Sequence, residues 1–143
     1  MDSLRRKVFL MVISLAFLVA KSGMAQNGQL HISFADIKKK GEVHAAIWES
    51  ESSFLGKKPF QGKIVAVTDG KAVVHFQDLP YGTYAVSVFL DTNGNRKLDT
   101  NIVGIPKEPY AFSNNASGLF GPPKFSEASF EIKRPLTEIQ ISF

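Results

Sequence analysis

The chain has 143 residues, a formal net charge of +4 and no cysteine. Its length fits a single domain that can bury a core of its own. The lack of cysteine excludes disulfides, thiolate zinc sites and thiol nucleophiles.

Residues 1–25 have the three regions of a secretory signal peptide. A basic stretch at residues 5–7 precedes an uncharged apolar stretch at residues 8–20, and small residues at Gly23 and Ala25 flank a cleavage site before Gln26. The apolar stretch is shorter than the about 20 residues that a membrane span needs. The sequence therefore predicts an exported protein, periplasmic or extracellular, with no membrane span after cleavage. An uncleaved N-terminal anchor is the alternative.

Most of the positive charge belongs to this predicted signal peptide. Its four cationic residues and one anionic residue give a net charge of +3, which leaves +1 for residues 26–143. The basic run at residues 38–40 adjoins Gly41 and is typical of a solvated turn. The charge pattern thus gives no indication of a nucleic-acid partner.

Residues 26–143 alternate apolar and polar side chains with a period of two, which predicts β-strands. The candidate strands are residues 30–34, 42–48, 63–68, 72–76, 83–90, 128–132 and 138–143. Seven short strands separated by turns predict an all-β fold, a seven-stranded antiparallel β-sandwich in one domain. The side chains expected in its core are Ile47, Val65, Val86, Val88, Phe130 and Ile141.

Residues 91–125 interrupt this alternation. Connections of this length are usually functional or disordered. The segment is too apolar for a solvated linker, since it contains Ile102, Val103, Ile105, Tyr110, Phe112, Leu119, Phe120 and Phe125. We therefore expect one long ordered loop that folds back over one end of the sandwich.

The start of this loop has the spacing of a cation-binding site. In a calcium loop the first, third and fifth side chains converge on the ion, the seventh residue supplies its carbonyl, and the ninth often acts through water. The residues at these positions are Asp91, Asn93, Asn95, Lys97 and Asp99. The pattern predicts a weak Ca²⁺ site, with a dissociation constant of roughly 10⁻⁴ to 10⁻³ M.

Two positions depart from the helical calcium hand. Arg96 stands where the sixth residue is usually glycine, and Ile102 stands where the twelfth is a bidentate glutamate. Glu108, an isolated acid further along the loop, could complete the coordination or simply lie on the surface. The alternative interpretation of the whole segment is a tight turn, which the dipeptide Asn93-Gly94 favours.

Catalysis finds little support in the sequence. His31, His44 and His75 lie in three different candidate strands, where a half-exposed histidine is more common than a ligand or base. No serine lies in a nucleophile elbow. We therefore predict a protein that is not an enzyme.

Aromatic residues give a stronger indication of binding. Trp48, Tyr110 and Phe112 lie in or near predicted turns and loops, where rings can form a platform for a sugar or a peptide. The alternative places these rings in the core. Exposure of Trp48 and Tyr110 on one surface would favour the platform, and complete burial would favour the core.

An ordered series of segments resembles a known family. The series consists of Asp78-Leu79-Pro80-Tyr81-Gly82-Thr83-Tyr84, Asp91-Thr92-Asn93-Gly94-Asn95, Gly104-Ile105-Pro106-Lys107-Glu108, Phe112-Ser113-Asn114-Asn115, Gly121-Pro122-Pro123-Lys124-Phe125 and Ala128-Ser129-Phe130. It resembles the DUF2141 family of small exported bacterial proteins over essentially all of residues 26–143. The resemblance implies a secreted β-sandwich and no established activity.

The resemblance also refines the expected sandwich. The segment at residues 79–84 is similar to a wider group of sandwiches related to transthyretin, so we expect an immunoglobulin-like or transthyretin-like arrangement. The family usually has a histidine at the position of Leu90 and commonly a glycine at that of Arg96. The departure at Leu90 leaves the chain without the histidine that could serve a metal there.

The sequence is compatible with three functions. The leading hypothesis is a non-enzymatic exported protein, stabilised by calcium, that mediates an interaction with an unknown envelope protein or glycan. The alternative is an accessory module that binds a carbohydrate or peptide through its loop aromatics. An envelope enzyme with a metal-assisted site is the third.

Overall fold

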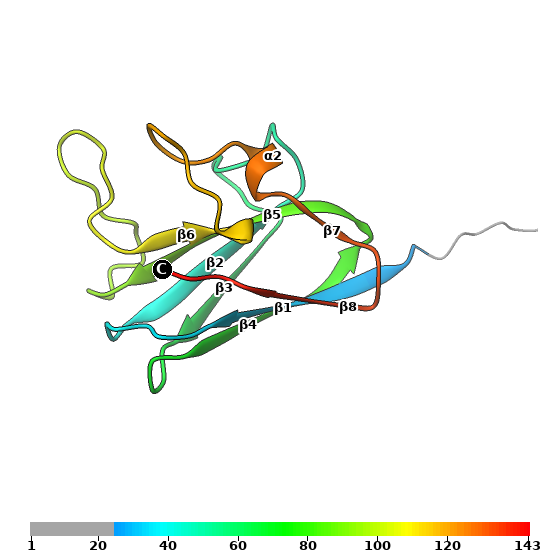
Figure 1. Ribbon diagram of the computed structural model, residues 1–143, viewed down its shortest axis with the longest axis horizontal. Coiled ribbons are helices and arrows are strands. Elements are labelled where there is room, and N and C mark those ends of the chain that lie inside the picture. Colours follow the sequence, from blue (N-terminus) through cyan, green and yellow to red (C-terminus); the bar gives the residue numbers. More distant parts are fainter. Residues whose placement is uncertain (1–24) are drawn as a thin grey trace, which may run out of the picture.

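The computed structural model describes residues 25–143 (Figure 1). The predicted signal peptide falls almost wholly on residues 1–24 and lies outside the described residues. Between residues 25 and 143, no helix is long and apolar enough to cross a membrane.

The described residues are mostly β and form two sheets. The strands are β1 (Asn27–Phe34), β2 (Glu42–Trp48), β3 (Gln61–Ala66), β4 (Ala72–Pro80), β5 (Gly82–Asp91), β6 (Tyr110–Phe112), β7 (Phe130–Ile132) and β8 (Leu136–Gln140). The three-stranded sheet has the order β4-β1-β8. The five-stranded sheet has the order β3-β2-β5-β6, and β7 pairs with the start of β5. Two short helices, η1 (Ser113–Asn115) and α2 (Phe125–Ala128), lie between β6 and β7.

Two features correct the predicted seven-stranded antiparallel arrangement. Residues 25–143 contain eight strands, because β6 lies inside the predicted loop, and its three residues are too few to show an alternation. In addition, β1 and β8 pair in parallel, with Ile32 beside Ile139. Side chains alternate with the same period in parallel and antiparallel strands, so the sequence pattern does not distinguish the two pairings.

The predicted core is confirmed. Ile47, Val86, Val88 and Ile141 are buried in one cluster that draws side chains from both sheets. The other two predicted members, Val65 and Phe130, are partly buried and pack against that cluster.

The five-stranded sheet also carries apolar side chains on the face that points away from the core. Side chains of β2 and β5 alternate, so that Val43 and Val86 enter the core while the outer face carries the residues between them. We call this second surface the outer face; it presents Glu42, His44, Trp48, Ser87, Phe89, Asp91, Tyr110 and Phe112. At one end of it, Phe112, Ala85 and Ala128 form a small second cluster.

Hydrogen bonds from η1 hold the segment between β6 and β7 against the outer face. The buried Ser113 hydroxyl accepts the N–H of Val86 at 2.8 Å and donates to the carbonyl of Ala128. The amide of Asn114 donates to the carbonyl of Ser129 at 2.8 Å. These contacts anchor a loop that rises from the sheet beside the loop between β5 and β6, on the side away from β1, β4 and β8 (Figure 1).

Candidate functional site

The Asp91 carboxylate organises the start of the loop that follows β5. The residue is 1% exposed. Its Oδ1 accepts the N–H of Gly94 at 2.7 Å, and its Oδ2 accepts the N–H of Arg96 at 2.7 Å. Both donors have positive φ, 75° for Gly94 and 62° for Arg96. The latter is the left-handed conformation that glycine adopts without cost, which accounts for glycine as the usual residue at this position in calcium loops.

The far end of the same loop brings three predicted ligands together. The side-chain amides of Asn93 and Asn95 donate to the Asp99 carboxylate at 2.6 Å and 2.9 Å. Each asparagine Oδ1 accepts a backbone N–H two residues further on, that of Asn95 at 3.1 Å and that of Lys97 at 2.9 Å. These are the local turns that asparagine side chains favour. The hydrogen bonds therefore close the loop around a carboxylate.

The donor set fits calcium in chemistry, but the two asparagine side chains turn their amide hydrogens toward Asp99. Ca²⁺ takes oxygen ligands from carboxylates, amide side chains and carbonyls, and the segment from Asp91 to Asp99 supplies all three. A bound cation would replace the amide hydrogens that face Asp99 with amide oxygens. The calcium site at Asp91, Asn93, Asn95, Lys97 and Asp99 therefore stays a prediction.

Glu108 joins the two ends of this loop. Glu108 is only 6% exposed. Oε1 accepts the N–H of Thr92 at 2.9 Å, and Oε2 accepts the N–H of Asp99 at 3.2 Å. Glu108 is therefore buried and does not lie on the surface, which was one of the two positions that the sequence allowed. It clamps the loop, whether or not it also ligates an ion.

The environment of Asp91 lowers the pKa of its carboxyl group. Burial alone would raise this pKa, but hydrogen bonds from the backbone N–H groups of Arg96, Gly94 and Asn93, together with the charge of His44, bring it below the 3.8 that is ordinary for aspartate. A lowered folded-state pKa means that the stabilisation is complete above pH 3.8 and is lost as the pH falls below that value.

We expect this linkage to appear in the acid denaturation of the protein. Between pH 5 and pH 3 the urea midpoint of the parent should fall more than that of an Asp91→Asn variant, because the variant has no carboxylate to protonate. Urea titrations followed by circular dichroism would measure both. Parallel pH profiles for the two proteins would contradict the assignment, and Asp69→Asn, in the turn between β3 and β4, serves as the matched control.

A cleft of about 680 Å³ lies on the outer face. Its lining includes Trp48 from β2, Phe89 from β5, and Tyr110 and Phe112 from β6. All three predicted platform residues thus line one cleft. Trp48 is 5% exposed and Phe112 is 6% exposed, so they form its floor, and only Tyr110, 43% exposed at its side, has the exposure that was expected of a platform residue.

Two apolar loops form the walls of this cleft. They correct the expectation of one long loop that folds back over one end of the sandwich. Val103 and Ile105 line it from the loop between β5 and β6, and Phe120 lines it from the loop between η1 and α2. The tips are open to solvent, with Ile102 at 104% and Phe120 at 102% exposure. Phe112 is buried, as the apolar composition of the segment predicted. Composition alone does not tell which apolar side chains of a loop are buried and which are exposed.

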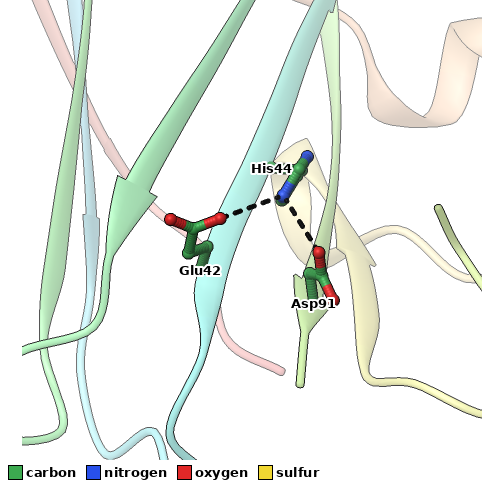
Figure 2. Close-up of side chains that lie close together, drawn as sticks. All are labelled: Glu42, His44 and Asp91. Atoms are coloured by element: carbon green, nitrogen blue, oxygen red, sulfur yellow. Dashed lines mark ion pairs between the residues drawn. The ribbon is translucent and has the colours of Figure 1, made fainter. Parts of the chain in front are cut away.

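The sequence interpretation missed a cluster at the edge of the outer face. His44 lies in β2 with its Nε2 between the carboxylates of Glu42 and Asp91 (Figure 2). Strand register produces this contact, because Glu42 pairs directly with Asp91 across the β2–β5 ladder. Only a prediction of that pairing could have found the cluster from the sequence.

The comparisons with known proteins establish the family. Residues 32–140 match the family described as uncharacterized protein conserved in bacteria (DUF2141). No curated protein and no solved structure matched the chain. The match covers well over half of the sequence, and the chain belongs to the DUF2141 family.

Proposed function

We propose that this DUF2141 protein is an exported, non-enzymatic binding protein whose outer-face cleft takes an apolar peptide segment of an envelope partner. We further infer that its two sheets form an immunoglobulin-like or transthyretin-like sandwich. One observation carries the binding proposal. Trp48, Tyr110 and Phe112, from two different strands, line a single cleft of about 680 Å³, within the range typical of ligand sites.

The chemistry of the cleft favours an apolar occupant. Its walls carry Leu98, Val103, Ile105 and Phe120, and exposed apolar surface of this kind marks interaction sites. A polar group on its floor, the hydroxyl of Ser87, already accepts the indole N–H of Trp48 at 2.9 Å. A sugar would need several free hydrogen-bonding groups around the ring on which it stacks. A peptide with an aliphatic or aromatic anchor needs fewer.

The charges next to the walls favour acidic residues beside that anchor. Arg96, Lys97 and Lys107 are exposed on the loop between β5 and β6, and Lys124 is exposed at the end of the second loop. The first loop also carries two carboxylates, Asp99 and Glu108, so the four cations leave a net charge of +2 on the two loops. An acidic peptide would therefore meet net positive charge at the cleft rim, which assists association.

Calcium has a structural role in this proposal. The predicted calcium loop ends at Asp99, and the wall residues Leu98 and Thr100 adjoin it on both sides. An ion that fixes the loop would fix the position of this wall and reduce the ordering cost of binding. The proposal assigns no catalytic role to any residue.

The position of Trp48, the chain's single tryptophan, makes the cleft directly observable. We expect peptides selected from a random seven-residue library on the immobilised protein to combine an apolar anchor with acidic residues. Such peptides, once synthesised, should shift the Trp48 emission in a saturable titration, because they change the polarity around the indole.

Paired variants locate the response. The double variant Val103→Ser, Phe120→Ser changes two exposed wall residues and should weaken peptide binding at least about tenfold, the factor that corresponds to 1.4 kcal/mol. Val73→Ser changes an exposed apolar residue of β4, in the other sheet, and should not affect it. A saturable response to maltohexaose or a chitin oligosaccharide, with none to the peptides, would support the alternative of a carbohydrate-binding module. No response to either probe would refute the proposed cleft function.

A further inference from the structure

The cluster of Glu42, His44 and Asp91 has the composition of a metal site. Glu42 and His44 project from the same face of β2, and Asp91 ends β5 directly opposite Glu42. Figure 2 shows the imidazole reaching between the two carboxylates. The ligand atoms of the three side chains all lie within 4.8 Å of one another.

Among residues 25–143, the histidine nitrogen in this cluster has no hydrogen-bond partner. Nε2 of His44 is buried, and it lies 3.5 Å from Oδ2 of Asp91 and 3.8 Å from Oε2 of Glu42. Buried polar atoms are almost always satisfied, so an unsatisfied one requires an explanation. The ring is held in this position by stacking on Phe89, with a centroid separation of 4.6 Å.

The two separations from His44 are close to those of atoms that share one small cation. Zinc binds imidazole nitrogen at about 2.0–2.1 Å and carboxylate oxygen at about 2.0–2.2 Å, so two ligands at a tetrahedral angle lie roughly 3.3–3.5 Å apart. The observed 3.5 Å is at that value, and the 3.8 Å contact needs only a small movement of Glu42, whose side chain is 44% exposed. An ion between the three atoms would complete the coordination of Nε2.

Charge and ligand type define the class of cation. Two carboxylates balance a dication, and in residues 25–143 their only ion-pair partner is His44. Imidazole with carboxylates suits first-row transition cations such as Zn²⁺, whereas calcium takes oxygen ligands alone. We propose that Glu42, His44 and Asp91 form a three-residue site for a divalent transition-metal ion of the zinc type. The proposal is independent of the cleft function.

This site is distinct from the predicted calcium site but shares Asp91 with it. The Oδ2 atom that faces His44 also accepts the N–H of Arg96 at 2.7 Å. A zinc-type ion would therefore lie at the base of the calcium loop, on the side of β2. Glu42 and His44 do not belong to the loop, so substitutions there test the transition-metal site alone.

Another pair of histidines could bind the same metals and must be separated in the test. His31 and His75 are cross-strand partners on β1 and β4, with ring centroids 4.1 Å apart. They lie on the three-stranded sheet, where Glu138 of β8 is the register partner of His31, but among the described residues no carboxylate lies close enough to form a three-residue cluster with them. The variant His75→Gln is therefore the matched control.

The experiment is calorimetric titration of the metal-free protein with Zn²⁺ in calcium-free buffer, because calcium in the loop would compete for Asp91. We expect one Zn²⁺ per chain and, with Co²⁺ as a spectroscopic substitute, visible absorption bands of a nitrogen- and oxygen-ligated ion. Glu42→Gln and His44→Gln should each weaken Zn²⁺ binding at least about tenfold, and His75→Gln should leave it unchanged. If His44→Gln fails to fold, the exposed Glu42→Gln decides. Loss of binding only in His75→Gln would place the metal on the histidine pair and overturn the proposal, as would the absence of Zn²⁺ binding by the parent.

Discussion

Replacing Glu108 with alanine is expected to lower the free energy of unfolding by about 3 kcal/mol, because hydrogen bonds to a charged acceptor contribute about 1.5–3 kcal/mol each and unsatisfied buried donors add a further cost. The Glu108 carboxylate accepts the backbone N–H groups of Thr92 and Asp99, and the residue is 6% exposed. Its removal leaves both donors without a partner inside the loop. Urea denaturation followed by circular dichroism measures the change.

Two further variants separate this clamp from a general effect of charge. Glu108→Gln retains one acceptor oxygen, so its loss of stability should be intermediate. Glu131→Ala removes an exposed carboxylate that pairs with Lys133 at the surface, and its effect should stay within about 0.5 kcal/mol. If Glu108→Ala unfolds at the same urea concentration as Glu131→Ala, the two hydrogen bonds do not hold the loop in solution.

The secondary structure was predictable to the extent that it depends on alternation. Ile47 and Val86 occupy apolar positions of long alternating strands, and both are fully buried. Alternation does not report how strands pair, so the parallel contact between β1 and β8 could not be predicted. It also fails for β6, whose pairing with β5 rather than its own three residues makes it a strand.

In the candidate site, too, contacts between residues close in sequence are predictable, whereas contacts between distant residues are not. The spacing of Asn93, Asn95 and Asp99 lets these side chains meet, because the contact forms within seven residues of chain. The role of Glu108 depends on hydrogen bonds across 9 and 16 residues, and no local pattern indicates them. His44 reaches Asp91 through strand register alone.

The structure also changes what a substitution at Asp91 should do. Considered as a calcium ligand only, Asp91 could be replaced by alanine with little effect on the calcium-free protein. Its two oxygens also accept the N–H groups of Gly94 and Arg96, so that variant would damage the loop whether or not an ion is bound. A test of calcium binding therefore needs another ligand.

Asp99 is the better position for that test. Its carboxylate accepts the side-chain amides of Asn93 and Asn95, and Asp99→Asn keeps one acceptor oxygen for them. The variant lowers the charge of the predicted ligand set from two carboxylates to one, which should weaken calcium binding strongly. The calcium-free stability should change little. Asp69→Asn makes the same exchange in a turn outside the loop and is the control.

Calcium should stabilise the parent protein by mass action, in zinc-free buffer, by about 2.7 kcal/mol at 100 times the dissociation constant. Asp99→Asn should lose most of this gain and Asp69→Asn should keep it. Magnesium should substitute poorly, because it requires a smaller octahedral site and gives up its water reluctantly. Thermal melting with and without each ion measures the effect. If millimolar calcium leaves the melting temperature of the parent unchanged, the amide–carboxylate hydrogen bonds alone close the loop, and the segment from Asp91 to Asp99 is a turn without an ion.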